Sequence, residues 1–208
     1  MLEDYRKLKK KMKKTLPETR YRHSVNVANT AVALAMCYGK NIDRAYIAGI
    51  LHDCAKAVPD EDRVRLTLEA GLEVTDVEKR NPALLHAKLG AVMAERDYGI
   101  RDSGILNAIR YHTTGRPAMT MLEKIIFVSD YIEPMRDRAP RLRLLRMLAF
   151  QDLDRCVYEI TADSVAYLEK RFPDSMDTMT LKTYRYYKRI LSERKTSEEM
   201  NGPDEGNR

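Results

Sequence analysis

The stretch AGILHDCAK, residues 48–56, runs an apolar helical face directly into the dipeptide His52-Asp53. We expect this helix to begin at Asp43, because aspartate is a preferred residue at helix N-caps. Small and branched apolar side chains before His52 predict that the face is buried. The imidazole and the carboxylate are therefore expected at or near the end of a buried helix.

The same helical pattern extends outward from this stretch in both directions. Apolar residues recur every three or four positions, and no stretch alternates with the period of two that a strand requires. Turn residues divide the pattern into segments. Besides the helix from Asp43, we expect helices at about residues 1–17, 19–38, 59–71, 82–99, 102–112, 121–133, 151–172 and 177–195. The predicted fold class is all-α, a helical bundle.

The size and composition of the chain fit one globular domain. The 208 residues are 44% hydrophobic and 33% charged, a balance that can bury a substantial core. We expect a basic helix over residues 1–17, a main domain over 18–195 and a disordered polar tail over 196–208. No apolar run is long enough for a membrane span and no secretion signal is evident, so the expected location is the cytoplasm. Three cysteines without a CxxC pair argue against a disulfide framework.

The formal net charge of +6 is concentrated at the amino terminus. Residues 1–22 contain nine Lys or Arg and three acidic residues, so the rest of the chain is formally neutral. Such a cluster can attract a polyanion, and an RNA-associated basic module is therefore one alternative. However, Tyr5, Leu8, Met12 and Leu16 recur at helical spacing, which favours an amphipathic helix with a solvated basic face. We expect no stable nucleic-acid partner.

All four histidines and two aspartates form a candidate set of metal ligands. These side chains follow one another at spacings of roughly one helical hairpin, and a bundle can bring such positions to one interior point. Imidazole and carboxylate donors without thiolate suit Fe, Mn, Zn, Ni or Co. Taken singly, His86 or His112 could instead be a core histidine bonded to a carbonyl group. The six predicted ligands are His23, His52, Asp53, His86, His112 and Asp130.

Among the six residues, Asp130 is the strongest single indication of a metal site. It lies between Phe127-Val128 and Tyr131-Ile132 in a helix that Thr120 and Glu123 should start as a capping box. A carboxylate on such an apolar helix is expected to be buried, and a buried unpaired carboxylate is costly. The sequence therefore predicts a cation beside Asp130.

The order His, His-Asp, His, His, Asp resembles that of the HD-domain metal-dependent phosphohydrolases. Within this family, the sequences around these residues most resemble those of the bacterial YqeK-type symmetrical bis(5'-nucleosyl)-tetraphosphatases. The matching stretches are RYRHSVNVANTAVALA (20–35), AGILHDCAK (48–56), LLHAKLGAVMA (84–94) and AIRYHTTGRPAMTMLEKIIFVSDYIEPMRD (108–137). HTTGR followed by DYIEP is more discriminating than His-Asp alone.

The resemblance implies an all-α HD-domain bundle with a binuclear metal site in its core. It implies that His23, His52, Asp53 and Asp130 hold one ion, and that Asp53, His86 and His112 hold the other. Iron is the metal expected first, with Mn, Co, Ni and Zn as alternatives. It also implies the substrate, a dinucleoside polyphosphate such as diadenosine tetraphosphate, which is cut symmetrically into two ADP. Attack by a metal-bridging hydroxide is the expected mechanism.

A polyphosphate substrate needs cations and hydroxyls besides the metals. Asp53 and Lys56 are predicted to act in the reaction, Asp53 between the two ions and Lys56 at the scissile phosphate. Arg20, Thr113, Arg116 and Arg136 are added as substrate-binding candidates because each lies close in sequence to a predicted ligand. The alternative for these arginines is ordinary salt bridging.

Three other functions remain open on the sequence alone. The first is an HD-domain nucleotide phosphohydrolase or phosphodiesterase of another specificity. The second is a di-iron oxygenase, since similar ligand sets can activate dioxygen, and the third is the RNA-associated module. A homodimer is a further expectation, with Tyr184, Tyr186 and Tyr187 as a candidate contact surface.

Overall fold

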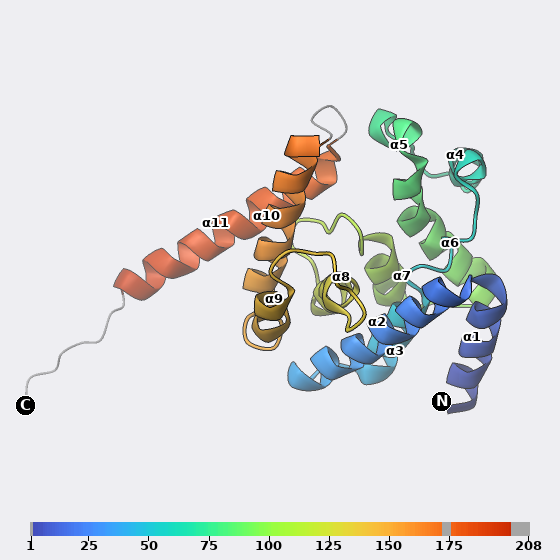
Figure 1. Ribbon diagram of the computed structural model, residues 1–208, viewed down its shortest axis with the longest axis horizontal. Helices are drawn as coiled ribbons and strands as arrows, with labels where there is room; N and C mark the ends of the chain where they lie inside the picture. Colours follow the sequence, from blue (N-terminus) through green and yellow to red (C-terminus); the bar gives the residue numbers. More distant parts are fainter. Residues whose placement is uncertain (1, 172–175, 201–208) are drawn as a thin grey trace, which may run out of the picture.

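The computed structural model describes residues 2–171 and 176–200 as an assembly of helices (Figure 1). No strand occurs in this part of the chain, and the prediction of an all-α fold is confirmed. The elements are α1 (Leu2–Thr15), α2 (Glu18–Cys37), α3 (Ile42–Leu51), α4 (Asp60–Glu69), α5 (Asp76–Arg80), the 3₁₀ helix η1 (Pro82–Leu85), α6 (His86–Tyr98), α7 (Ser103–Arg110), α8 (Met121–Ile132), α9 (Leu142–Leu148), α10 (Leu153–Arg171) and α11 (Thr178–Met200).

Helix α8 lies in the middle of the bundle and contacts α2, α3, α7, α9 and α10 (Figure 1). Its buried residues include Ile125, Ile126 and Val128, which are fully inaccessible to solvent. The most extensive helix pairing is between α2 and α3. Small residues allow this close approach, because a Cβ atom at Gly49 would lie only 2.7 Å from the Cα atom of Ala28. The predicted ligands on α2, on α8 and directly after α3 are thereby held close together.

The capping box that starts α8 is present as predicted. The Thr120 hydroxyl accepts a hydrogen bond from the Glu123 amide at 3.4 Å, and the Thr120 amide donates to Glu123 Oε2 at 2.6 Å. This box fixes where the helix begins. Asp130 therefore occupies a defined position about two and a half turns further along α8.

The start of α3 differs from the prediction. Asn41, not Asp43, is the N-cap, and its side chain accepts from the Arg44 amide at 2.9 Å. Asp43 lies in the first turn, where its carboxylate accepts a hydrogen bond from the Tyr5 hydroxyl of α1. A capping oxygen must precede the free amides of the first turn, and Asn41 has that position.

Two short helices, α5 and α9, were not predicted. Helix α5 is one turn held by a second capping box between Thr75 and Glu78, too short for a periodic pattern to reveal. The segment expected as one helix from Pro82 begins as η1 and continues as α6. Helix α11 extends to Met200, five residues past the expected end at 195. The rest of the predicted tail, residues 201–208, lies outside the described residues.

The basic helix α1 packs on the bundle through its apolar face. Met12 is fully buried, Leu16 is 5% exposed, and the Tyr5 ring lies 4.3 Å from the ring of Tyr46 in α3. The lysines of α1 lie mainly on its solvent side. Within residues 2–171 and 176–200, none of the helices has the length and apolar character needed to cross a bilayer.

Candidate metal centre

The structure brings all six predicted ligands into one cluster. Most of them lie at helix ends: His52 and Asp53 follow α3, His86 is the first residue of α6, and His112 follows α7. His23 lies in α2 and Asp130 lies in α8. The four side chains at the helix ends are at most 3% exposed, while His23 and Asp130 are partly accessible. The cluster is thus a buried polar site with one side open to solvent.

Three histidines are oriented in the same way by the main chain. Nδ1 of His52 lies 2.7 Å from the Gly49 carbonyl oxygen, Nδ1 of His86 lies 2.5 Å from that of Ala83, and Nδ1 of His112 lies 2.7 Å from that of Ile109. A carbonyl oxygen can only accept, so each Nδ1 donates its proton. In the neutral ring, Nε2 is then an unprotonated donor atom for a metal, and in each case it faces the cluster.

Asp53 lies between two groups of histidines. Its Oδ1 atom is 3.3 Å from Nε2 of His86 and 3.5 Å from Nε2 of His112. Its Oδ2 atom is 3.7 Å from Nε2 of His52. Each carboxylate oxygen therefore faces a different group, which is the arrangement that a carboxylate bridging two ions requires.

The second group of side chains gathers around Asp130. Its Oδ1 atom lies 3.0 Å from Nε2 of His23 and 3.9 Å from Nε2 of His52. The other nitrogen of His23, Nδ1, lies 3.2 Å from Oε1 of Glu133. His23, His52 and Asp130 thus offer three donor atoms within 4.8 Å of one another, as do His52, Asp53 and His112.

The donor set of this cluster fits bound cations. Nε2 of His52 is buried and has no hydrogen-bond partner within residues 2–171 and 176–200. Nε2 of His86 lies 3.1 Å from Nε2 of His112, so two lone pairs face each other. The Thr113 hydroxyl, 3.2 Å and 3.1 Å from these two nitrogens, supplies one hydrogen for both. Buried acceptors that outnumber their donors are costly without a cation, so the residues present suit metal ions.

The pKa values of His52, His86 and Asp53 are all lowered from their ordinary values. Burial lowers the pKa of His52 to about 4, and burial also lowers the pKa of His86. Burial alone would raise the pKa of Asp53, but its contacts with His52, His112 and His86 hold that pKa well below its ordinary value. Neutral imidazoles and an ionised carboxylate are the states that bind metals.

His23 and Asp130 form a partly accessible pair in which the mutual hydrogen bond outweighs the effect of burial on each pKa. Burial opposes the charged form of His23, but the hydrogen bond to Asp130 raises its pKa overall. Burial would likewise raise the pKa of Asp130, and the hydrogen bond from His23 lowers it instead. A metal ion bound here would displace the proton that these two side chains share.

Three predicted substrate-binding cations lie around the cluster. Arg20 Nη1 is 3.6 Å from Asp53 Oδ2, and Arg136 Nη2 is 2.9 Å from Asp130 Oδ1. Lys56 is half-buried, and burial lowers its pKa while the charge of Asp53 opposes that change. Thr113 lies directly on the cluster, as described above.

Arg116 does not join these cations. Its guanidinium pairs with Glu123, with nitrogen–oxygen distances of 2.9 to 3.1 Å, and it lies over the ring of Tyr111. Glu123 is 1% exposed and needs a partner. Arg116 therefore makes the ordinary salt bridge that its sequence left open as the alternative to a substrate contact.

Glu133 also belongs to the site, although it was not among the residues predicted from the sequence. Its Oε1 atom accepts from His23, and its Oε2 atom accepts from the Asn26 amide at 3.0 Å and the Met135 main chain at 2.7 Å. Glu133 is 3% exposed, and Arg146 bonds the adjoining carbonyl oxygens. Its position in DYIEP could have indicated a role in the site, because Glu133 lies three residues, about one helical turn, after Asp130.

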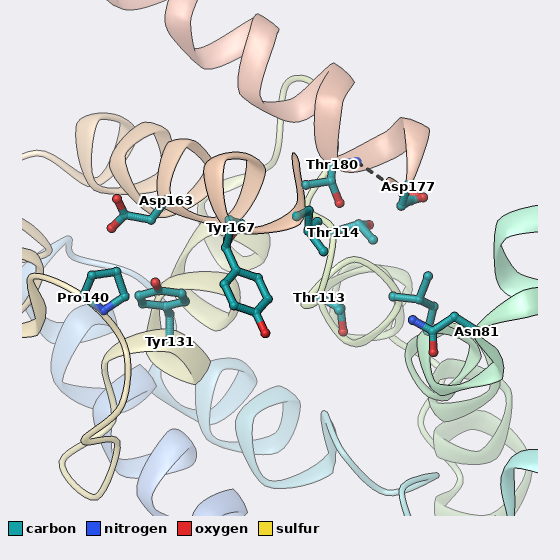
Figure 2. A pocket seen from close by; sticks show the side chains of 12 residues that line it. Asn81, Thr113, Thr114, Tyr131, Pro140, Asp163, Tyr167, Asp177 and Thr180 are labelled. Atoms are coloured by element: carbon teal, nitrogen blue, oxygen red, sulfur yellow. Dashed lines mark hydrogen bonds between the residues drawn. The ribbon is translucent and has the colours of Figure 1, made fainter. Parts of the chain in front are cut away.

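A cavity of about 370 Å³ lies beside the cluster and is shown in Figure 2. Its wall includes Thr113, Tyr131 and Tyr167, and the side chains come from η1, α8, α10, α11 and the segments that join helices. Figure 2 shows Tyr167 reaching down from α10 between Tyr131 and Thr113. The cavity and the cluster therefore meet at Thr113.

Known proteins resemble this chain over most of its length. Residues 20–135 match the HD domain family. The symmetrical bis(5'-nucleosyl)-tetraphosphatase of Bacillus subtilis is 41% identical over 171 residues, which cover 80% of this chain and 91% of the relative. The protein of the same name from Halalkalibacterium halodurans is 37% identical, with 88% and 95% covered.

A solved structure agrees with these matches. The crystal structure of a predicted HD superfamily hydrolase involved in NAD metabolism, from Clostridium acetobutylicum, superposes with a TM-score of 0.85 at 36% identity. The superposition covers 89% of this chain and 97% of that one. The resemblance expected from the His and Asp motifs is therefore confirmed, and the chain belongs to the HD-domain family, in the group of the symmetrical bis(5'-nucleosyl)-tetraphosphatases.

Proposed function

We propose that this protein hydrolyses dinucleoside polyphosphates symmetrically, converting diadenosine tetraphosphate and water to two ADP. The relatives named for this activity are matched over most of their length. The single structural observation that supports it most is Asp53, whose two oxygens face two separate groups of histidines. A pair of cations held by nitrogen and oxygen donors is typical of phosphoester hydrolases.

We assign the ligands as the motif order implies. His23, His52, Asp53 and Asp130 would hold one ion, and Asp53, His86 and His112 would hold the other. When bound, two such ions lower the pKa of a water molecule and neutralise charge on the attacked phosphate. We propose iron as the natural metal, with Mn, Co, Ni and Zn as metals that the same donors accept.

The chain's own residues prepare the site before substrate arrives. The bonds from Nδ1 to main-chain carbonyl groups fix the imidazole rings of His52, His86 and His112 and keep their Nε2 lone pairs directed inward. Glu133 does the same for His23 from the open side of the cluster. The surrounding apolar core excludes water, which strengthens the interactions of the site with a charged substrate.

Arg20, Lys56 and Arg136 are proposed to bind the phosphate chain. Each is a cation beside the cluster, and charge on the phosphate oxygens grows during attack. Lys56 is the residue assigned to the scissile phosphate, and Thr113 can donate its hydroxyl to a neighbouring phosphate oxygen. Arg116 is assigned to holding Glu123, not to the substrate.

The reaction needs no dedicated proton donor for its leaving group. The oxygen of water forms a new bond to phosphorus, the bridging phosphoanhydride bond breaks, and ADP departs. A terminal phosphate has its second pKa near 6, so ADP is a good leaving group at neutral pH. The proton of the attacking water leaves to solvent.

We also infer the setting in which the protein works. A small-molecule nucleotide is its partner in the reaction, and the cytoplasm is the compartment where we expect it. The buried side of α1 supports a structural role for that helix in place of stable nucleic-acid binding. A homodimer stays a prediction, although Tyr187 is 1% exposed and is withdrawn from the expected contact surface.

Product analysis tests the proposed function. Purified enzyme with each of the candidate metals is incubated with diadenosine tetraphosphate without oxygen, and the nucleotides are separated by ion-exchange chromatography. The expected products are two ADP per substrate, while ATP with AMP would contradict symmetrical cleavage. A requirement for oxygen would favour the oxygenase alternative. Tight, salt-dependent RNA binding that survives Asp53→Asn, without turnover in the wild type, would favour the RNA-associated module.

A further inference from the structure

The cavity beside the cluster is built from residues adjacent to the proposed metal ligands. Thr113 directly follows His112 in the chain, and Tyr131 directly follows Asp130. The Thr113 hydroxyl lies 3.1 Å from Nε2 of His112. Any molecule that fills this cavity is therefore within reach of the site where the phosphate chain is proposed to bind.

The size and lining of the cavity fit one nucleoside. Its volume of about 370 Å³ lies at the lower end of the range, about 300–1,000 Å³, that is usual for small-molecule sites. Leu84, Pro140 and Leu168 contribute apolar wall, and the other lining residues add aromatic rings, hydroxyls, an amide and carboxylates. We infer that the cavity binds the base and ribose of one half of the substrate, with Tyr131 and Tyr167 holding the base. This inference rests on the proposed function.

The two tyrosines supply aromatic surface from different helices. Figure 2 shows Tyr131 on α8 and Tyr167 on α10 side by side at the cavity, with Thr113 close to Tyr167. Tyr167 is 57% exposed, so a ligand can reach its ring. Aromatic rings bind nucleobases by stacking, and the ring faces of all the bases allow it.

Polar groups stand at the end of the cavity farthest from Tyr131. Asn81 and Asp177 line this end (Figure 2). Among the residues that the structure describes, Asp177 Oδ1 accepts from the amides of Met179 and Thr180 at 2.9 Å and 3.3 Å, while Oδ2 has one long contact of 3.4 Å, to Met179. A carboxylate oxygen with spare acceptor capacity can receive a hydrogen bond from an exocyclic amino group of a base. The side-chain amide of Asn81, at the same end of the cavity, can both donate and accept hydrogen bonds.

ADP binding tests the inference, because ADP carries one nucleoside and the two phosphates of one product. Isothermal titration of the metal-loaded protein with ADP is compared among Tyr167→Ala, Tyr167→Phe and Tyr158→Ala. Tyr158 is the matched control, since it is a tyrosine of α10 that does not line the cavity. Tyr167→Ala is expected to weaken ADP binding about 5-fold or more, and Tyr167→Phe and the control to stay within about 2-fold.

Pyrophosphate separates a nucleoside site from a phosphate site. It shares the phosphates of ADP but lacks the nucleoside, so Tyr167→Ala should leave its binding unchanged. Asn81→Ala, at the opposite end of the cavity, should weaken ADP in the same selective way. Because Asn81 and Tyr167 are exposed, neither change is expected to prevent folding.

The outcomes distinguish this inference from the proposed function. Diadenosine tetraphosphate hydrolysis with ADP binding that is insensitive to Tyr167→Ala would overturn the nucleoside site and leave the function intact. Equal weakening of ADP and pyrophosphate would also overturn it, because the change would then act on the phosphates. Tyrosine-dependent ADP binding without diadenosine tetraphosphate hydrolysis would support the site and contradict the substrate.

Discussion

Nδ1 of His23 lies 3.2 Å from Oε1 of Glu133, across 110 positions of sequence. This contact leaves Nε2 of His23 directed at Asp130. It gives His23 the orienting acceptor that the other three histidines receive from main-chain carbonyl groups. Glu133 therefore completes a pattern in which each proposed histidine ligand has one fixed nitrogen.

Glu133→Ala is predicted to weaken metal binding. Without the carboxylate, His23 loses its orientation and its preferred protonation state, and changes of this kind cost about 10- to 100-fold in metal affinity or activity. Elemental analysis after dialysis against graded chelator measures the loss. Glu133→Gln should fall between, since an amide oxygen can still accept from His23 but its NH₂ group meets other donors. Unchanged metal affinity in Glu133→Ala would contradict the role of Glu133.

Asp53→Asn is predicted to lose both turnover and metal. An amide offers one acceptor oxygen in place of two, so it cannot face both groups of histidines as the carboxylate does. We expect kcat to fall by more than about 100-fold, which exceeds the effect of losing an outer contact. The metal content of the purified variant should fall from two ions per chain to one or none. Two retained ions would argue against a bridging Asp53.

Acid is predicted to destabilise the metal-free protein through His52. Its pKa is about 4 in the folded state against 6.5 as the ordinary value, so the unfolded state binds more protons between these limits. Stability is thus retained above pH 6.5 and lost as the pH falls toward 4, by up to about 3 kcal/mol from this group. Urea unfolding of metal-free protein from pH 7 to 4.5 measures the slope. His52→Gln should flatten it, and an equal slope in the variant would exclude His52 as the cause.

Arg116→Ala is predicted to reduce stability more than catalysis. The change leaves the buried Glu123 carboxylate without its guanidinium partner, a loss of at least about 2 kcal/mol. Thermal unfolding should show a lower Tm, while KM for diadenosine tetraphosphate should stay within about 3-fold. Arg20→Ala is the comparison, because Arg20 is half-exposed beside Asp53 and should raise KM with little change in Tm. A large KM effect in Arg116→Ala would restore it as a substrate contact.

The three cysteines are predicted to differ in reactivity. Burial raises the pKa of Cys54 and of Cys156 to about 12, and both thiols are inaccessible, whereas Cys37 is exposed. The thiolate is the reactive form, so iodoacetamide at pH 8 should label Cys37 alone in the folded protein. Mass spectrometry should find one label per native chain and three after denaturation. Rapid native labelling of Cys54 would indicate that the region beside Asp53 opens.

The sequence alone was sufficient for the all-α fold and for the identity of the six clustered side chains. Helical periodicity and the capping box at Thr120 depend on neighbours within a few positions, so local sequence carries them. The scarcity of histidine made the ligand set visible, since the chain has only four and each lies in an apolar or motif context. The start of α3 and the short helices α5 and α9 were beyond this local information.

Tertiary structure alone decided which polar residues serve the site and which serve the fold. Arg116 and Arg136 each follow a predicted ligand closely in sequence, yet one pairs with Glu123 and the other with Asp130. The cavity shows the same dependence, because Asn81, Tyr131 and Tyr167 line it from three separate segments of the chain. Such partnerships depend on distances between helices far apart in the chain, and a one-dimensional pattern records residue types and spacings but not those distances.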